Sequence, residues 1–417
     1  MTSEQPTGEF HGRKVVRAAF VLGFFGWGLG FYGPPIFLGV IRESTGWSVV
    51  LISIAITLHF LVGALAGANL PNLHQRFGVV IVTKAGGLMM AAGIIGWAVA
   101  SSPWHLYIAA GLSGAGWGTM SAAALNAIVS PWFVRGRPAA LGMAYNGGSV
   151  GGIVFSPLWA TAISGIGFPL AASIVVIIMV LTIWTLAQRV FSQTPVMMGL
   201  RPDGDEPGAA AASVTSPRAR PLPGALLWRD RRFVTLAAGM ALGLFAQIGL
   251  IAHLYSLLVP ALGAAKSGLA MGLITVVAIA GRTLIGRLMP LGTDRRMVAS
   301  GGYAVQVVGS LAFILALGTS VPLLVTGVVL FGVGFGIATS LPPLIAQIEF
   351  VPEDVPRVAA LIVAIAQVGY AFAPAAFGLI RERTPATTAT GEMPALFAAA
   401  ALVQCLAVAA FLAGRRR

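Results

Sequence analysis

Arg282 is the residue with the clearest capacity for chemistry, because it is a charge inside a continuous apolar run. The run covers 268–290, GLAMGLITVVAIAGRTLIGRLMP, with Arg282 two thirds of the way along and Arg287 near its end. A charged side chain at the centre of a bilayer costs about 2.5–3.5 kcal/mol on insertion scales. Arginine stays charged, and its planar fork donates two parallel hydrogen bonds to a carboxylate. This pattern predicts a fixed cation that binds an anion.

A second interpretation pairs Arg282 with helix-end carbonyls or with an acid at the end of a span. The thirteen Asp and Glu residues all fall in predicted loops, tails or span ends, and Glu349 comes nearest to an interior position. A permanent acidic partner in the middle of the membrane is therefore not expected, and contact with an anionic substrate is the favoured interpretation.

The elements that must position Arg282 are membrane helices. The chain has 417 residues, of which 57% are hydrophobic and only 9% charged, and its mean hydropathy is +0.88. Soluble domains carry roughly a quarter charged residues. Apolar runs of about 20 residues predict helices, whereas barrel strands would be short alternating segments. We expect an all-α polytopic membrane protein.

Twelve spans are predicted, in two groups of six. A segment rich in Pro, Ala, Ser and charge separates the groups and is typical of a flexible linker. The expected organisation is a six-helix half at 1–187, a cytoplasmic linker at 188–232 and a second half at 233–417. The spans fall at about 17–41, 48–71, 79–100, 104–129, 138–163, 167–187, 233–260, 267–289, 297–317, 320–348, 355–380 and 394–414.

The loop charges predict the orientation. One side carries 21 of the 26 Lys and Arg residues and the other side four, with Arg282 between them. Basic loops stay in the cytoplasm, so both termini and the linker are expected there, in a bacterial-type inner membrane. The net charge of +13 is explained by this topology, and nucleic acid is not an expected partner. The lipid bilayer is.

Three motifs recur between the halves at nearly one offset. Gly114-x-Gly116-x-Gly118 returns as 332–336, the segment 137–141 (RPAAL) returns as 357–361 (RVAAL), and 67–71 (GANLP) returns as 286–290 (GRLMP). The offsets are 218, 220 and 219. They predict two parallel six-helix pseudo-repeats, an arrangement in which transporters bind the substrate between the repeats near the bilayer midplane.

Twelve spans in two halves with a long central loop resemble the major facilitator superfamily. Three stretches are similar to its monocarboxylate transporter and oxalate/formate antiporter branch: 131–144 (PWFVRGRPAALGMA), 198–205 (MGLRPDGD) and Gly281-Arg282 followed by Gly286. The resemblance implies the major facilitator fold and gives Arg282 the role of substrate-binding arginine.

The sequence departs from this family in several places. Gln75 stands where the loop between spans two and three usually has Asp, and the matching loop after span eight has either Pro290 or Asp294 at that position, depending on register. Animal members of the branch carry an aspartate one turn before the arginine, which here is Ala278, and a lysine in span one, near Pro35. The usual proton-coupling residues are therefore missing.

Other intramembrane polar groups form a wider candidate site. His59 and His253 are candidate proton carriers, since histidine titrates near neutral pH; the alternative for each is a neutral ring hydrogen-bonded to a neighbouring helix. The branch resemblance assigns Phe335 and Thr339 to the substrate lining. Each candidate could instead serve packing or an interhelical hydrogen bond. The remaining polar candidates are Tyr32, Tyr145, Asn146, Gln247 and Gln367.

The predicted function is secondary active transport of a small organic anion, a mono- or dicarboxylate, by alternating access. Without the aspartate at Ala278, anion exchange is at least as plausible as proton symport. An efflux carrier for drug-like or uncharged molecules is the alternative, and a non-transporting sensor is a third. No Walker motif, metal-ligand cluster or catalytic triad occurs, so neither an enzyme nor a cofactor is expected. A monomer is expected.

Overall fold

The structure is a computed structural model that describes residues 10–204, 224–290, 292–384 and 394–415, without the side chains of 224–225 and 338–340. Every regular element in these ranges is helical, as expected for an all-α protein. The α-helices are α1 (His11–Gly30), α2 (Gly33–Thr45), α3 (Val49–Ala68), α4 (Leu70–Ala98), α5 (Pro103–Gly118), α6 (Ala122–Val129), α7 (Arg137–Ile166), α8 (Phe168–Leu186), α9 (Gly224–Leu227), α10 (Arg231–Leu288), α11 (Arg295–Leu315), α12 (Val321–Glu349), α13 (Val355–Ala371), α14 (Ala373–Arg383) and α15 (Pro394–Ala413). Short turns lie at Ser130–Trp132, Ala187–Phe191 and Pro202–Gly204.

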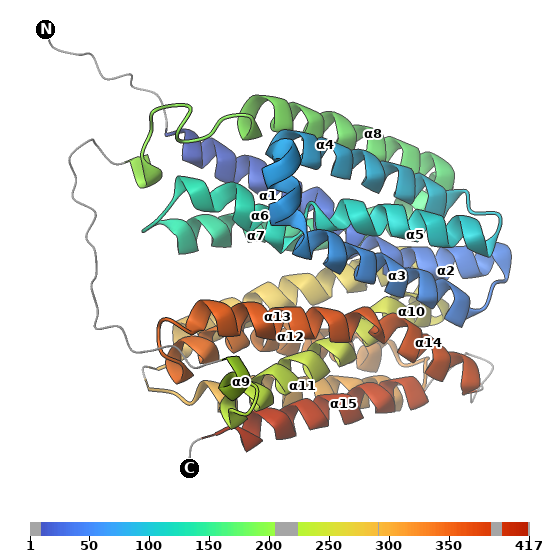
Figure 1. Ribbon diagram of the computed structural model, residues 1–417. Helices are drawn as coiled ribbons and strands as arrows, with labels where there is room; N and C mark the ends of the chain where they lie inside the picture. The colour runs from blue at the N-terminus through green and yellow to red at the C-terminus, as the bar shows by residue number, and fades with distance from the viewer. Residues whose placement is uncertain (1–9, 205–223, 291, 385–393, 416–417) are drawn as a thin grey trace, which may run out of the picture.

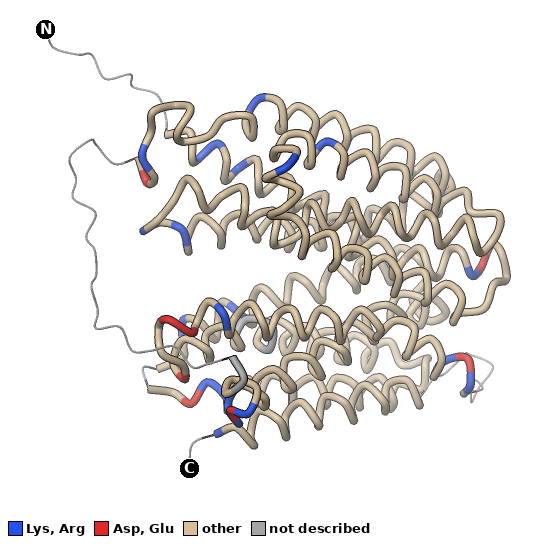
Figure 2. Tube along the Cα trace, in the orientation of Figure 1, with Lys and Arg blue, Asp and Glu red and all other residues tan. Residues whose placement is uncertain are grey.

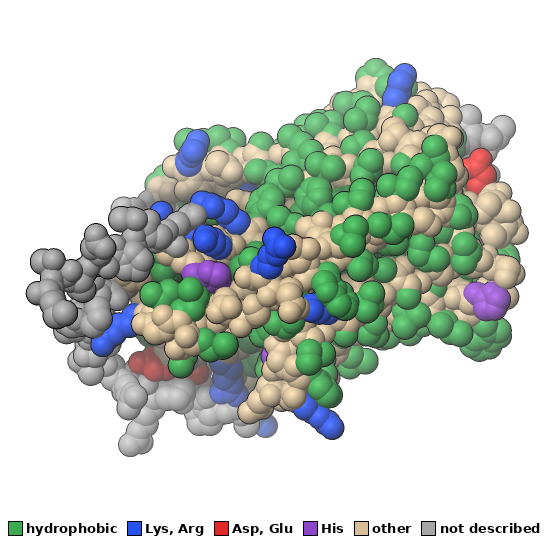
Figure 3. Space-filling model, turned by 90° about the horizontal axis from the view of Figure 1, so that it is seen from above, with side chains coloured by type: hydrophobic (Ala, Val, Ile, Leu, Met, Phe, Trp, Pro, Cys, Tyr) green, Lys and Arg blue, Asp and Glu red, His purple; other side chains and the backbone are tan. Residues whose placement is uncertain are grey.

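Ten helical stretches in the described ranges are long and apolar enough to cross a membrane. Two features separate this number from the twelve predicted spans. The seventh and eighth spans share α10, which turns at Gly263 with a positive φ of 74°. The fourth span is divided into α5 and α6 by a break after Gly118. Figure 3 shows hydrophobic side chains spread across one face of the molecule, as a lipid-facing surface requires. Ile177, Ile178 and Leu181 of α8 are among the exposed hydrophobic residues.

The first predicted span is broken between α1 and α2 because of its prolines. Pro34 has no N–H, so the carbonyl of Gly30, four residues earlier, loses its helical donor. Nε2 of His59 on α3 supplies the missing hydrogen bond at 2.8 Å. The carbonyl of Gly28 is likewise served by Nε1 of Trp159 on α7, at 3.3 Å. The break therefore fixes α1 against two neighbouring helices and places Tyr32 at its centre.

The helices form two bundles, α1–α8 above and α9–α15 below in Figure 1. Glycines show that the bundles repeat each other. A Cβ added at Gly114 or Gly118 would collide with α3, and one at Gly116 would collide with α4. The corresponding positions Gly332 and Gly336 lie as closely against α10, and Gly334 against α11. The repeated glycine motif thus makes corresponding close contacts in the two bundles.

Among the described residues, the core that joins the two bundles lies toward one end. Lys and Arg gather at the end of the molecule that holds the start of α1, the start of α11 and residue 415 (Figure 2). We call this the basic end, and we call the other end the opposite end. One cluster joins the buried side chains of the first bundle to second-bundle residues near the opposite end, such as Leu254 and Phe377. Near the basic end, the second bundle has a separate core around Phe233, Tyr303 and Phe411.

Candidate functional site

One stripe of α10 faces the first bundle. A Cβ added at Gly268 would lie 2.5 Å from the Cβ of Ala160 on α7, and one at Gly272 would lie 3.2 Å from the carbonyl oxygen of Ile153. Thr275 and Arg282 continue this stripe at helical spacing, three and ten residues beyond Gly272. The face that packs on α12 is a different one and includes Gly281, against the backbone of Val333. Arg282 therefore projects toward the space between the bundles.

Arg282 is exposed and makes no hydrogen bond or ion pair with any residue that the structure describes. The Arg282 charge interacts with the hydroxyl group of Tyr32, which lies at the break between α1 and α2. The Tyr32 hydroxyl in turn lies beside the hydroxyl of Thr275 and within reach of the Arg282 charge. Thr275 Oγ1 is buried and has no hydrogen-bond partner of ordinary geometry within the described chain. A cation, a phenol and an aliphatic hydroxyl from both bundles thus converge.

Tyr32 holds this place because α7 provides room for its ring. A Cβ added at Gly152 would lie 2.4 Å from the ring and 2.8 Å from the hydroxyl oxygen of Tyr32. Only glycine permits such a close approach at this point of α7. The ring also packs edge-to-face on Phe31, with centroids 5.0 Å apart.

Tyr145 and Asn146 belong to the same part of the molecule. Asn146 precedes Ile153 by seven residues, and Tyr145 precedes Gly152 by seven, so both lie on the faces of α7 that carry those contacts. Residues 264–288 of α10 run antiparallel to α7, since Gly268 lies against Ala160 and Gly272 lies against Ile153. Arg282 follows Gly272 by ten residues, so it is level with the turn of α7 that carries Tyr145 and Asn146. Both side chains are exposed, and the Tyr145 hydroxyl lies 3.5 Å from the carbonyl of Ala122.

Phe335 lies on α12 beside the site. It is partly buried and packs 6.4 Å from the ring of Phe331. Its neighbour Gly336 touches the backbone of Ala278, one turn before Arg282. Thr339 follows one turn later, but its side chain lies outside the part of the chain whose side chains are described. Gly332 and Gly336 therefore place the part of α12 that carries Phe335 beside α10.

His59 has a structural environment. Its Nε2 donates to the Gly30 carbonyl, and its Nδ1 lies 2.8 Å from Ser113 Oγ. Ser113 Oγ also accepts from Nε1 of Trp97 at 3.0 Å. The ring is fully buried, and these two contacts satisfy a neutral imidazole. The arrangement is that of the alternative interpretation, a histidine hydrogen-bonded between helices.

His253, Gln247 and Gln367 lie away from Arg282. His253 Nε2 donates to the carbonyl of Pro374 at 3.0 Å, near the opposite end, while Nδ1 has no partner among the described residues. Gln247 is buried one turn beyond Gly243, which packs on Tyr303 inside the second bundle. Gln367 is next to the Tyr370 hydroxyl. The structure does not bring these three side chains together with Arg282.

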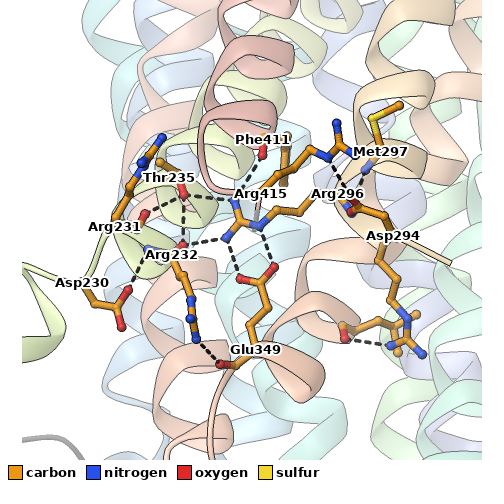
Figure 4. Close-up of polar contacts among 12 residues, drawn as sticks. Asp230, Arg231, Arg232, Thr235, Asp294, Arg296, Met297, Glu349, Phe411 and Arg415 are labelled. Carbon is orange, nitrogen blue, oxygen red and sulfur yellow. Dashed lines mark hydrogen bonds and ion pairs between the residues drawn. The ribbon is translucent and has the colours of Figure 1, made fainter. Parts of the chain in front are cut away.

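A charge cluster closes the basic end of the second bundle (Figure 4). Arg296 is almost fully buried and forms an ion pair with Glu349 at 2.7 Å. Its Nη2 donates to the carbonyl of Arg232 at 2.8 Å, and its Nη1 to Thr235 Oγ1 at 3.0 Å. Asp294 caps the start of α11 and accepts from Arg415 Nε at 2.6 Å.

The first bundle has a different acid at its basic end. Asp203 accepts hydrogen bonds from the backbone N–H groups of Val134, Arg135 and Gly136, at 3.1, 2.9 and 3.1 Å. Its partial desolvation would raise the pKa of this carboxyl, but the three N–H donors and the Arg135 charge outweigh that effect and hold the pKa below its usual range. Asp203 adopts a positive φ of 63°, which aspartate tolerates better than most residues.

Two features escaped the sequence reasoning. Thr275 was not among the candidates, although its spacing of seven residues from Arg282 puts both on one face. Arg381 was counted as a loop residue, but it lies in α14 and is only 6% exposed. A search for cations within one turn of a span end would have found it. Within the described ranges, no three His, Cys, Asp or Glu side chains could hold a metal ion.

Comparisons with known proteins agree with this architecture. The family model for the Major Facilitator Superfamily matches residues 18–374. An uncharacterized 38 kDa protein encoded in the 23S RNA operon of Thermoproteus tenax is 27% identical over 92% of this chain and 89% of its own length. The multidrug resistance protein MdtH of Yersinia enterocolitica is 38% identical over 74 residues, which is 18% of either chain.

Solved structures share the fold at low sequence identity. A mutant form of the nucleoside transporter NupG has a TM-score of 0.70 at 14% identity and covers 96% of this chain and 100% of its own. A bacterial homologue of the human lysosomal transporter Spinster, in an inward-facing and occupied conformation, has a TM-score of 0.71 at 15% identity, with 98% and 97% covered. The D-xylose–proton symporter has a TM-score of 0.69 at 12% identity, with 96% and 97% covered. The family model matches most of this chain, which therefore belongs to the major facilitator superfamily of membrane transporters.

Proposed function

We propose that the chain carries a small organic anion, a mono- or dicarboxylate, and that Arg282 binds the carboxylate. The observation that carries this proposal is an exposed arginine between the bundles with no acidic partner in the described chain. An unpaired cation within membrane depth is costly, and an anionic substrate would supply the charge that the protein does not. Tyr32 and Thr275 add neutral hydroxyl groups that suit the second carboxylate oxygen or a substituent.

The two halves, 1–187 and 233–417 with the linker 188–232 between them, are proposed to move as units during transport. Contacts between the bundles support one closed gate, at the opposite end. Val50 N–H donates to Glu382 Oε2 at 3.0 Å, and Ala375 N–H donates to Thr57 Oγ1 at 3.2 Å. Phe60 and Tyr370 pack edge-to-face across the same boundary, with centroids 5.8 Å apart. Toward the basic end, by contrast, Arg282, Tyr145 and Asn146 are exposed.

We assign the basic end to the cytoplasm, because Lys and Arg in short loops are retained on that side. In this orientation the conformation is inward-facing, and the termini and the linker are cytoplasmic. A bacterial-type inner membrane is the proposed location, and a monomer is the proposed functional unit, as each chain contains both halves of the site.

Exchange of one anion for another is the proposed mode of transport. An anion leaves an unpaired arginine most easily when a second anion takes its place. His59 is hydrogen-bonded at both ring nitrogens, so the alternative of proton symport would depend on His253, whose Nδ1 has no partner in the described ranges.

Proteoliposomes containing the purified protein test this function. A panel of labelled carboxylates should enter only when a carboxylate is present inside, and Arg282→Gln should abolish uptake. Arg287→Gln is the matched control, an exposed arginine one turn and a half further along α10, and should retain uptake. Uptake driven by a pH gradient into vesicles without internal anion would contradict exchange. Uptake of uncharged or hydrophobic cationic compounds, independent of Arg282, would favour the efflux alternative that the MdtH segment suggests.

A further inference from the structure

The closed gate at the opposite end contains a cavity of about 570 Å³ between the bundles. The first bundle contributes residues of α2 and α7 to its wall, and the second bundle contributes residues of α10 on either side of Pro260. Arg42, Tyr255 and Ser256 provide the polar lining, together with Glu43. Figure 2 shows charges at this end in the last turn of α2 and at the end of α14.

A buried arginine lies directly behind this wall. Arg381 on α14 is 6% exposed, and its Nη1 donates to Ser256 Oγ at 2.6 Å. Its Nε is buried and has no hydrogen-bond partner in the described chain. Among the residues described, no carboxylate forms an ion pair with it. A buried guanidinium with one neutral partner is an incomplete site, because buried charges are normally paired.

The neighbouring charges make this deficit larger. The charge of Arg381 interacts with the like charge of Arg42, which belongs to the other bundle. His253 lies within reach of both arginines, and it already donates to a backbone carbonyl. Of the two acids in this region, Glu382 accepts from the backbone of α3 and Glu43 lines the cavity beside Tyr255. Neither forms an ion pair with Arg381 within the described ranges. Like charges therefore face each other across the gate.

We propose that this cavity is a second anion site, in which a small carboxylate bridges Arg42 and Arg381. The bound anion would join the two bundles where their own charges repel, so it would stabilise the closed gate. In the orientation proposed above, the site faces the outside and would receive the carboxylate before it reaches Arg282. The ligand class rests on the proposed function, whereas the need for an anion at Arg381 does not.

Thermal unfolding of the full chain in nanodiscs tests this site in an Arg282→Gln background, which removes the central cation. Sodium acetate should raise the midpoint relative to sodium chloride of equal concentration, because only the carboxylate can occupy the arginine fork with two oxygens. Replacing Arg381 by Gln should abolish the acetate-dependent rise, and replacing Arg42 by Gln should weaken it. Arg383→Gln is the matched control, an exposed arginine on the same helix, and should leave the rise intact.

The outcomes separate this site from the central one. An acetate effect that disappears with Arg282→Gln alone would overturn the second site while leaving the proposed function intact. An effect that survives Arg282→Gln unchanged from the wild type and disappears only with Arg381→Gln would support the second site and contradict carboxylate binding at Arg282. Equal shifts with chloride and acetate would contradict a carboxylate site. Arg381→Gln removes an unpaired buried charge, so misfolding of this variant is not expected; Arg42→Gln, at an exposed residue, gives an independent measurement.

Discussion

Arg296 and Glu349 form a two-pronged ion pair: Nε lies 2.7 Å from Oε1, and Nη2 lies 2.8 Å from Oε2. Arg296 is buried, and its guanidinium also donates to Thr235 Oγ1 and to the carbonyls of Arg232 and Phe411 (Figure 4). Arg282, fourteen residues earlier, has none of these partners in the described chain. The same protein thus completes one arginine with its own acid and leaves another open.

Replacing Glu349 by Gln should destabilise the second bundle by about 3–5 kcal/mol, since removing one partner of a buried ion pair leaves the other charge uncompensated. Denaturant unfolding in detergent measures the change. The double variant Arg296→Met, Glu349→Leu should recover much of this stability, because it removes both charges. A Glu349→Gln protein as stable as the wild type would show that the pair contributes nothing.

Tyr32→Phe removes a hydroxyl beside Thr275 and Arg282 but keeps the ring over Gly152. We expect carboxylate affinity to fall about 2–10-fold, as for the loss of one neutral hydrogen bond, with little change in unfolding temperature. Titration of the purified variant measures both quantities. Tyr107→Phe, at the opposite end on α5, is the control. Unchanged affinity in Tyr32→Phe would remove the hydroxyl from the site.

His59→Phe should destabilise the first bundle without changing how transport depends on pH. The variant leaves the Gly30 carbonyl, orphaned by Pro34, without its donor, at a cost of about 1–3 kcal/mol. His105→Phe, at an exposed histidine that contacts Ser101, is the control for stability. If the pH profile of uptake shifts in His59→Phe while folding is unaffected, His59 carries protons and the structural role assigned to it is wrong.

Docking of Pro202–Gly204 on the start of α7 should depend on pH. Because folding lowers the pKa of Asp203, its carboxylate stabilises the docked loop at pH values above the ordinary value of 3.8, and this contribution is lost as the pH falls through the lowered pKa. Hydrogen exchange at Val134–Gly136 measures docking. Asp203→Asn tolerates the positive φ but lacks the charge, so it should exchange faster at neutral pH. Equal protection in both proteins at neutral pH would contradict the role of the charge.

Much of the fold followed from the sequence because the membrane restricts it strongly. Apolar runs located the helices, and the glycine repeats located the same close approaches in both bundles. The prolines at 34 and 35 indicated a break, but not that His59 and Trp159 would serve the freed carbonyls, since those partners are distant in sequence. The seventh and eighth predicted spans form one element, α10, because Gly263 is the one residue in it that leaves the helical conformation.

The site was predictable only in part. Arg282 stands out by its cost in an apolar helix, so sequence reasoning located it. Its relation to Tyr32 and Thr275 depends on which helix faces meet, and that is set by packing at Gly152, Gly268 and Gly272. The buried position of Arg381 was hidden because a charge one turn from a span end resembles an ordinary loop cation.

Carboxylate affinity in Arg282 variants tests the central claim most directly. Calorimetric titration of the purified protein with a transported carboxylate should give at least about a tenfold loss for Arg282→Gln, corresponding to the 1.5–3 kcal/mol of a charged hydrogen bond. Arg282→Lys should lie between, since it keeps the charge and loses the fork, and Arg287→Gln should bind as the wild type does. Wild-type affinity in Arg282→Gln would contradict the account.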